Sequence, residues 1–233
     1  MTMISDNLQQ VRARMATACA QAGRLTSEVR LLAVSKTFSA SAVREAVDAG
    51  QGTFGENYVQ EGVEKIQALR SSALEFPLEW HMIGPIQSNK TRLVAENFGW
   101  VHSVDRLKTA QRLSEQRPAH LAPLQVCLQV NVDDGPNKSG VVPQALEELA
   151  RQVASLPGLC LRGLMAIPEP STNVSAQNAV FSKVNTLFAA LKSRHASVDT
   201  LSMGMSADLE AAVQNGSTLV RVGTAIFGGR PAA

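Results

Sequence analysis

This sequence has few cysteines, few aromatic residues and no large excess of one charge. Its three cysteines, Cys19, Cys127 and Cys160, are widely spaced and form no C-x-x-C motif, which excludes a disulfide framework and a thiolate zinc site. We therefore expect buried free thiols. Twenty-two Lys and Arg residues oppose 20 Asp and Glu residues, so the net charge of +2 provides no general attraction for nucleic acid.

Long apolar runs are also absent. No segment approaches the roughly 20 apolar residues of a membrane-spanning helix, and residues 1–7 contain neither the basic nor the apolar stretch of a signal peptide. The four histidines, at positions 81, 102, 120 and 195, form no H-x-H or H-E-x-x-H motif that would support a catalytic metal. We expect a cytoplasmic protein that binds no membrane, nucleic acid or metal.

What is present is an ordinary globular composition, with 45% hydrophobic and 18% charged residues in 233. Short apolar runs typical of strands buried on both faces alternate with amphipathic segments. The expected strands are residues 29–35, 53–54, 78–83, 100–104, 124–132, 159–166, 200–203 and 219–222. The expected helices are residues 42–49, 59–69, 88–97, 106–116, 144–154, 176–193 and 207–214.

This alternation predicts an α/β fold, because about eight strand–helix units in one chain are typical of a (β/α)8 TIM barrel. Leu8, Val11, Met15 and Ala18 recur at helical spacing and predict an extra N-terminal helix. No linker-like segment interrupts the pattern, so we expect a single domain over residues 1–233. Active sites of such barrels lie at the carboxyl ends of the strands, which directs attention to the residues that end each strand.

Lys36 follows the first expected strand directly. Partial desolvation at a barrel mouth would lower the pKa of its amine and favour imine formation with an aldehyde. The alternative is a lysine that ends a strand and reaches into water, and position alone does not decide against it.

Two small-residue turns follow the last two expected strands. Ser202, Gly204 and Ser206 lie in SMGMS, and Gly223 and Thr224 lie in RVGT. Backbone N–H groups and hydroxyls in such turns can bind a phosphate, although an N-cap serine would also explain Ser206. Arg221, which by strand alternation points opposite to its neighbours, either enters the barrel mouth or caps a helix outside.

Two further segments give weaker evidence for a function. GQGTFG at residues 50–55 matches the dinucleotide-binding G-x-G-x-x-G pattern, but it follows a helix where that motif must follow a strand, so we reject it. Residues 133–140 are polar and rich in turn formers. They are consistent with a mobile loop over the barrel mouth, and equally with an ordinary surface loop.

Several sequence blocks occur in a fixed order along the chain. They are AVSKT at 33–37, FGENYVQE at 54–61, WHMIGPIQSNK at 80–90, NV at 131–132 with KSG at 138–140, RGLM at 162–165, SMGMS at 202–206 and RVGTAIFG at 221–228. Together they resemble one family, the pyridoxal phosphate homeostasis proteins, which are single-domain barrels similar to the N-terminal domain of alanine racemase. The resemblance covers essentially the whole chain.

The resemblance implies that Lys36 holds pyridoxal 5′-phosphate (PLP) covalently as an aldimine. It implies that Arg221 faces the pyridine nitrogen of PLP and that the two small-residue turns surround the phosphate. The residues that it places around the phosphate are Ser202, Gly204, Ser206, Gly223 and Thr224, and those that it places along the rest of the pocket are Asn57, His81 and Met165.

The family has no established turnover and is linked to intracellular vitamin B6 and amino-acid balance. Two physical arguments agree with a non-catalytic PLP-binding protein. An arginine opposite the pyridine nitrogen keeps it unprotonated and makes the ring a poor electron sink. A racemase also needs a second acid or base, which in alanine racemases is a tyrosine from an additional domain, and the one tyrosine here is Tyr58.

Two enzymatic alternatives remain at this point. One is a weak PLP-dependent amino-acid racemase of the same fold, and the other is a barrel aldolase whose lysine forms an imine with a sugar phosphate. For a PLP-binding homeostasis protein, PLP-dependent enzymes are the candidate recipients of the cofactor, and we expect the barrel to be a monomer.

Overall fold

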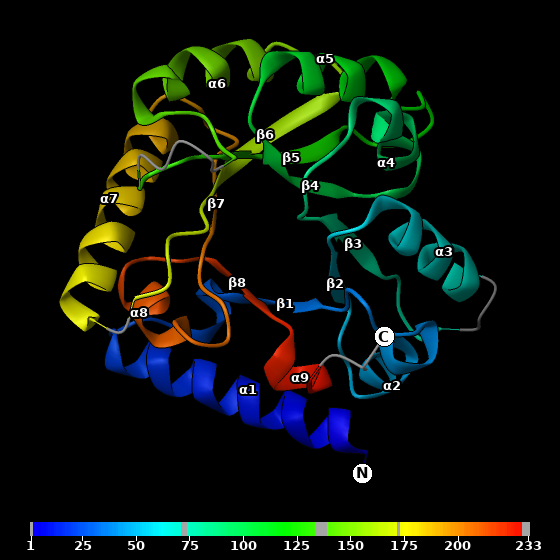
Figure 1. The fold of residues 1–233 in the computed structure, drawn as a ribbon, viewed down its shortest axis with the longest axis vertical. Helices are drawn as coiled ribbons and strands as arrows, with labels where there is room; N and C mark the ends of the chain where they lie inside the picture. Colours follow the sequence, from blue (N-terminus) through cyan, green and yellow to red (C-terminus); the bar gives the residue numbers. More distant parts are fainter. Residues whose placement is uncertain (1, 71–73, 134–138, 172, 230–233) are drawn as a thin grey trace.

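The computed structural model describes residues 2–70, 74–133, 139–171 and 173–229. Eight parallel strands form a closed barrel in which each strand pairs with its sequence neighbours and β8 pairs with β1 (Figure 1). The expected TIM barrel is therefore confirmed. The strands are β1 (Arg30–Val34), β2 (Thr53–Glu56), β3 (Glu79–Met82), β4 (Trp100–Val104), β5 (Leu124–Gln129), β6 (Leu159–Met165), β7 (Thr200–Ser202) and β8 (Leu219–Val222).

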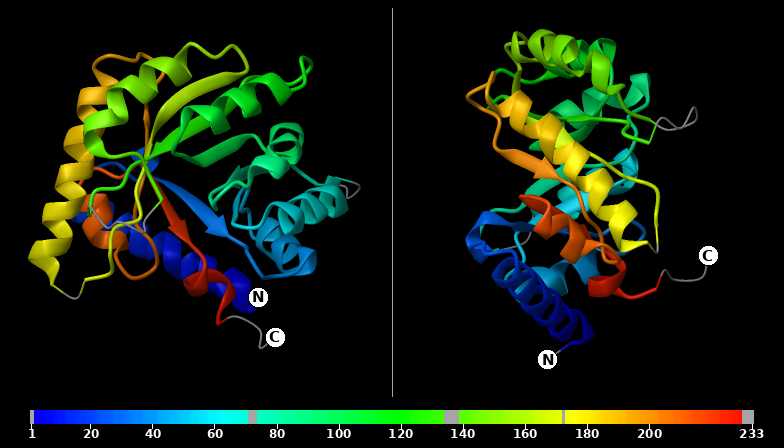
Figure 2. Two further views of the ribbon diagram at one scale, coloured as in Figure 1. Left: turned by 45° about the horizontal axis from the view of Figure 1, so that its top comes forward. Right: turned by 90° about the vertical axis from the view of Figure 1, so that its left-hand side faces the viewer.

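Helices surround the barrel, as the two further views show (Figure 2). They are α1 (Met3–Gln21), α2 (Ala40–Asp48), α3 (Val59–Arg70), α4 (Thr91–Asn97), α5 (Leu107–Gln116), α6 (Leu146–Ala154), α7 (Val174–Lys192), α8 (Leu209–Gln214) and α9 (Thr224–Phe227). Single 3-10 turns, η1 (Thr26–Glu28), η2 (Ser88–Lys90) and η3 (Pro143–Ala145), precede β1, α4 and α6.

The expected N-terminal helix is present as α1. Its N-cap is Thr2, whose hydroxyl accepts a hydrogen bond from the N–H of Ser5, and Leu8, Val11 and Met15 are buried on one face. This face packs against α8 and α9, so the first and last helices lie side by side at one edge of the molecule (Figure 1). The N-terminal helix thereby supports the two turns that end β7 and β8.

The expected element boundaries are close to the observed ones, with a few differences. The fifth strand is shorter than expected, because β5 ends at Gln129 and the chain then makes an isolated bridge between Val130 and Val141. The second strand is longer than the expected 53–54, and the expected helices 88–97 and 144–154 begin as the 3-10 turns η2 and η3. The short helix α9 was not expected, because its four residues are too few to produce a periodic pattern.

The core has two layers. The larger one lies between the strands and the surrounding helices and includes Phe54, Phe98 and Phe181. Inside the barrel lie two smaller apolar clusters, whose members are Leu32, Val34, Ile83 and Leu219 in one and Trp100, Cys127 and Met165 in the other. Buried polar side chains occupy the space that these clusters leave, which is unusual for a barrel interior, where branched apolar residues normally dominate.

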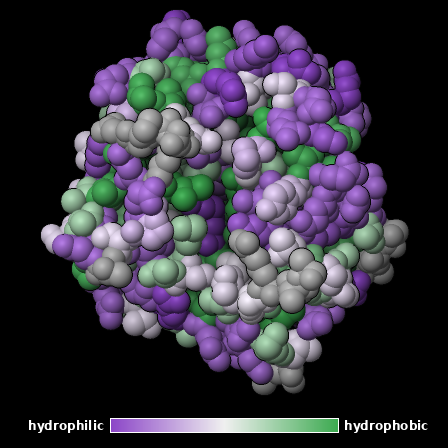
Figure 3. Space-filling model, in the orientation of Figure 1, coloured by the Kyte–Doolittle hydropathy of each residue, from purple (hydrophilic) through white to green (hydrophobic). Residues whose placement is uncertain are grey.

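The cysteine prediction is correct for two residues and wrong for the third. Cys19 and Cys127 are buried free thiols, and burial raises the pKa of Cys127 to about 12, whereas Cys160 is half-buried because its side chain sits near the start of β6. Within the described ranges, no helix has the length and apolar character needed to cross a membrane. On the face in Figure 3, hydrophilic residues predominate over the outer helices and hydrophobic ones form separate groups between them.

Candidate functional site

A cavity of about 310 Å³ lies at the carboxyl end of the barrel strands. Six of the ten predicted site residues line it, although they come from four separate parts of the chain: Lys36, Asn57, Ser206, Arg221, Gly223 and Thr224. The other lining residues were not predicted and are Val34, Phe38, Ile83, Ile167, Met205, Ala207 and Gly228. The cavity therefore combines two cationic side chains with small polar turns and an apolar wall.

The segment that carries Lys36 is held on both sides. Before it, the Ser35 hydroxyl donates to Glu56 Oε1 at 2.6 Å, and after it, the N–H of Thr37 donates to Glu61 Oε1 at 2.6 Å. Thr37 has φ of 67°, a left-handed conformation that costs a non-glycine residue energy and persists where its surroundings impose it. The lysine is thus presented to the cavity by a constrained turn.

Lys65 from α3 connects these two carboxylates. Its Nζ donates to Glu56 Oε1 at 2.8 Å, to Glu61 Oε1 at 2.5 Å and to the carbonyl oxygen of Ser35 at 2.6 Å. Burial raises the pKa of Glu56, and the charge and hydrogen bond of Lys65 oppose that rise. The sequence reasoning missed this cluster, although a charged residue on the apolar face of a helix, as Lys65 is, was a signal for it.

Asn57 is positioned by a close approach of two loops. At Gly84, which follows β3, an added Cβ would lie 2.2 Å from the carbonyl oxygen of Asn57, so this position accepts glycine alone. The side-chain Oδ1 of Asn57 is buried and has no hydrogen-bond partner among the described residues. The cavity wall therefore contains a side-chain amide with one polar atom that the described residues leave unsatisfied.

The two small-residue turns place backbone donors on the same cavity. The N–H groups of Ser206, Ala207 and Thr224 donate to no residue within the described part of the chain. Gly204 makes the first turn possible: its φ is 93°, and an added Cβ would lie 2.4 Å from the Cβ of Ala212. Gly204 does not line the cavity itself, but its carbonyl oxygen accepts from the N–H of Arg221 at 2.9 Å.

Arg221 points into the barrel, so the interpretation as an outer helix cap is excluded. Its Nη1 donates to the carbonyl oxygen and the hydroxyl of Ser202, at 2.7 and 2.8 Å, and its Nη2 donates to the carbonyl oxygen of Ala166 at 2.9 Å. These hydrogen bonds leave Nε without a partner among the described residues. Burial lowers the pKa of Arg221 to about 10, which still leaves the guanidinium charged at neutral pH.

The remaining predicted residues lie behind the cavity and not on it. His81, Met165 and Ser202 are fully buried inside the barrel, where Met165 packs with Trp100 and Cys127. Strand alternation alone could not separate residues that line the mouth from those one layer deeper, because both face the barrel axis. Residues 134–138 of the polar segment 133–140 lie outside the described residues.

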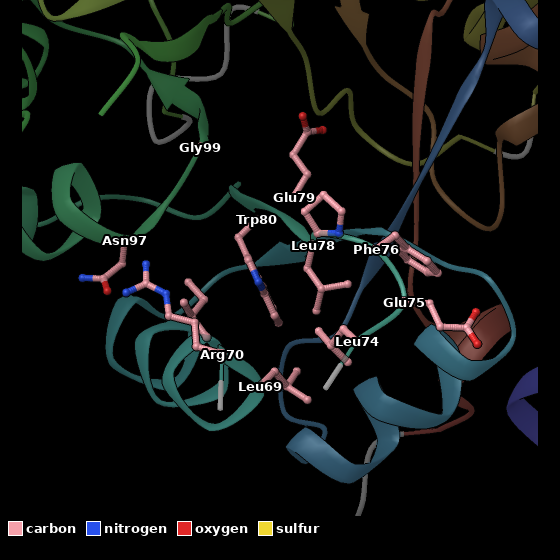
Figure 4. A pocket seen from close by; sticks show the side chains of 12 residues that line it. Leu69, Arg70, Leu74, Glu75, Phe76, Leu78, Glu79, Trp80, Asn97 and Gly99 are labelled. Atoms are coloured by element: carbon pink, nitrogen blue, oxygen red, sulfur yellow. The ribbon is translucent and has the colours of Figure 1, made fainter. Parts of the chain in front are cut away.

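A second cavity, of about 830 Å³, lies at the opposite end of β3 and contains none of the predicted residues. Its walls are mainly apolar and come from α3, the segment before β3 and the end of α4 (Figure 4). In Figure 4 the carboxylate of Glu79 points away from the side chains of Leu78 and Trp80, as strand alternation requires. Glu79 therefore points toward the amino-terminal mouth of the barrel, where its side chain is 37% exposed, whereas its neighbours face α3.

Comparison with known proteins gives consistent matches over the whole chain. The family model for the N-terminal domain of alanine racemase matches residues 6–231. The pyridoxal phosphate homeostasis protein of Escherichia coli (strain K12) is 55% identical over 230 residues, which are 99% of this chain and 98% of the relative. The protein of the same name from Pseudomonas aeruginosa is 56% identical over 230 residues, 99% and 97% of the two chains.

Solved structures agree with these sequence matches. PipY of Synechococcus elongatus PCC7942, in the structure with PLP bound, is 36% identical with a TM-score of 0.83, and the match covers 97% of this chain and 100% of PipY. Alanine racemase from Corynebacterium glutamicum is 18% identical with a TM-score of 0.66, over 99% of this chain and 62% of the racemase. The latter likeness concerns the fold alone.

Proposed function

Because this chain belongs to the pyridoxal phosphate homeostasis protein family, with the fold of the alanine racemase N-terminal domain, we propose that it binds PLP in the cavity around Lys36. Lys36 holds the PLP aldehyde as an imine, and the protein acts as a non-catalytic PLP-binding protein in vitamin B6 and amino-acid homeostasis. The observation that carries this proposal is the meeting of Lys36, Arg221 and two donor-rich turns on one cavity.

The residues of the cavity fit the chemical groups of PLP. The N–H groups of Ser206, Ala207 and Thr224 are three donors without a described partner, which suits a phosphate, a group that carries three acceptor oxygens. The hydroxyls of Ser206 and Thr224 add two further donors to the same turns. Lys36 and Arg221, which line the same cavity, are the groups that would meet the aldehyde and the ring.

Arg221 is the group proposed to face the pyridine nitrogen. A guanidinium that stays charged cannot accept a proton from the ring, and it keeps the nitrogen unprotonated by repulsion. Such a ring withdraws electrons from a bound substrate less effectively, which disfavours racemisation. The predicted residues that do not line the cavity, namely His81, Met165, Ser202 and Gly204, would then support the cofactor site from behind it.

The cavity also lacks a second acid or base among the described residues. Of those that line it, Lys36 and Arg221 are the titratable ones. Tyr58, the single tyrosine of the sequence, is 56% exposed and lines a different surface hollow with Lys90 and Arg106. This arrangement favours a PLP-binding protein over the racemase, because proton transfer to the opposite face of a substrate needs a positioned group there.

The direct test is the visible absorption spectrum of the purified protein with and without added PLP, followed by borohydride reduction and peptide mapping. A yellow protein whose reduced pyridoxyl group maps to Lys36 supports the proposal. A protein that stays colourless after PLP is added, or a reduced group found on other lysines alone, contradicts it and favours the aldolase alternative. Release of PLP to an apo form of a PLP-dependent enzyme then tests the role in homeostasis.

A further inference from the structure

A continuous chain of hydrogen bonds, buried from His81 onward, crosses the inside of the barrel from its amino-terminal end to the Lys36 cavity. Glu79 Oε1 lies 2.8 Å from His81 Nε2, and His81 Nδ1 lies 2.8 Å from His102 Nε2. His102 Nδ1 lies 2.9 Å from the hydroxyl of Ser202, which accepts from Arg221. Both histidines are fully buried, so water does not interrupt the chain at the rings.

The two ends of this chain carry fixed and opposite charges. Arg221 is a cation that can only donate. At the other end Glu79 is also paired with Arg30. Burial alone would raise the pKa of Glu79, but its hydrogen bond to His81 and its ion pair with Arg30 lower it, so Glu79 is an anion that can only accept.

These charges determine the direction of every hydrogen bond between them. Glu79 requires a proton on His81 Nε2, so a neutral His81 accepts at Nδ1 from a proton on His102 Nε2. A neutral His102 then accepts at Nδ1 from the Ser202 hydroxyl, whose oxygen accepts from Arg221. Each hydrogen bond of the chain then has one donor and one acceptor, and each donor points from Arg221 toward Glu79.

The reverse direction is chemically poorer. It would require a doubly protonated His81, whose Nδ1–H donates to His102, and a His102 that donates from Nδ1 to Ser202. The Ser202 oxygen would then receive two donors, and its own proton would have no acceptor among the hydrogen bonds of the described residues. Burial lowers the pKa of both rings, which opposes a buried imidazolium.

We propose that Glu79, His81, His102 and Ser202 are positioning residues that form a one-directional hydrogen-bond chain, by which a carboxylate at the amino-terminal end of the barrel holds Arg221 in place at the cavity. The direction of these hydrogen bonds follows from groups of the protein and needs no bound ligand. Its effect on the PLP ring rests on the function proposed above, because it is Arg221 that would face the ring nitrogen. A charge change at Glu79 then alters the cofactor site although Glu79 does not line the cavity.

The first experiment measures the two histidine tautomers by nitrogen-15 NMR of the full-length protein without PLP. Both rings are expected to be neutral and to carry their proton on Nε2. A proton on Nδ1 of His102, or a doubly protonated His81 at neutral pH, overturns the proposal. This measurement uses the unmodified protein, so its result does not depend on whether PLP binds or on whether a variant folds.

The second experiment is a double-mutant cycle of Glu79→Gln and Ser202→Ala, read by the PLP dissociation constant and by the absorption maximum of the loaded protein. Glu79→Gln removes the charge but keeps an acceptor at the same place. It is expected to weaken PLP binding by about fivefold and to shift the absorption maximum, because a charge-assisted hydrogen bond becomes a neutral one. In the Ser202→Ala background the same substitution is expected to change neither quantity, because the chain is already broken.

The matched control is Asp199→Asn, which removes another ion-paired carboxylate that is partly exposed, outside the chain. It is expected to leave both quantities unchanged. An effect of Glu79→Gln equal to that of Asp199→Asn, or one that persists in the Ser202→Ala background, overturns the proposal in favour of a general electrostatic effect. If the unmodified protein binds no PLP, the proposed function fails, and the histidine tautomers alone then test the direction of the hydrogen-bond chain.

Discussion

The two ends of the barrel both gather charged side chains, but they differ in how these are satisfied. At the amino-terminal end the ions are paired within the protein: Arg30 with Glu79, and Arg162 with Asp199. Both guanidiniums also lie over the Trp100 ring, with their carbon atoms 5.8 and 5.1 Å from the ring centroid. The charged groups at this end therefore have partners within the protein, as expected for a cluster that stabilises the fold.

At the carboxyl end the balance is different. Arg221 is buried with neutral partners, Ser202 and the carbonyl of Ala166, and three backbone N–H groups have no partner among the described residues. Donors without acceptors make this end complementary to an anionic ligand. In this barrel the placement of unsatisfied donors, more than the number of charged residues, distinguishes a binding site from a stabilising cluster.

The largest expected effect comes from removing the lysine at the carboxyl end. Lys36→Ala should abolish the borohydride-trapped pyridoxyl group completely, while weaker PLP binding through the phosphate-binding turns remains. The absorption spectrum and a binding titration measure the two effects. Lys108→Ala, at an exposed position of α5, is the matched control and should change neither. An imine band that survives in Lys36→Ala would contradict the assignment.

The next largest effect tests the support beneath Lys36. Lys65→Met leaves Glu56 buried without its cation and should lower the free energy of unfolding by about 3–5 kcal/mol. Chemical denaturation measures this loss. Arg44→Ala breaks an exposed ion pair with Asp48 and should cost less than about 1 kcal/mol. Equal costs for the two variants would show that the buried pair contributes no more than a surface one.

A smaller effect concerns the histidines that connect the two ends. Burial lowers the pKa of His81 and His102 in the folded state below the value of 6.5 expected for the unfolded chain. As the pH falls below 6.5, the unfolded chain binds protons that the folded protein does not, so stability decreases, by up to about 1.4 kcal/mol per pH unit for each ring. Denaturation between pH 7.5 and 5.5 measures the slope, and His102→Gln should reduce it. A flat profile would be inconsistent with two neutral buried rings.

The smallest effect is expected at Tyr58. Because this tyrosine lies outside the Lys36 cavity, Tyr58→Phe should leave PLP binding unchanged. Neither the unmodified protein nor this variant should exchange the α-hydrogen of L-alanine in deuterated water, as followed by NMR. Exchange that Lys36→Ala abolishes would instead support the racemase alternative, and its loss in Tyr58→Phe would identify the second acid or base.

Much of the fold and part of the site could be predicted from the sequence. Short apolar runs indicated the buried strands, and the residues that follow them, such as Lys36 and Thr224, do meet at one cavity. The depth of a residue along the barrel axis could not be predicted in this way. His81 and Ser202 face the same axis as Arg221 but lie below the cavity, because strand stagger and barrel closure set their height.

By itself the sequence determined the alternation of strands and helices, the N-terminal helix and the family, because these depend on local periodicity and on blocks of consecutive residues. The tertiary structure alone decided that Lys65 joins Glu56 and Glu61 beneath Lys36, and that Glu79 is linked to Arg221 through two histidines. These contacts join residues as far apart as 100 positions, such as His102 and Ser202. Closing the sheet into a barrel brings them within hydrogen-bond distance, and burial makes each unpaired polar atom costly enough to fix their partners.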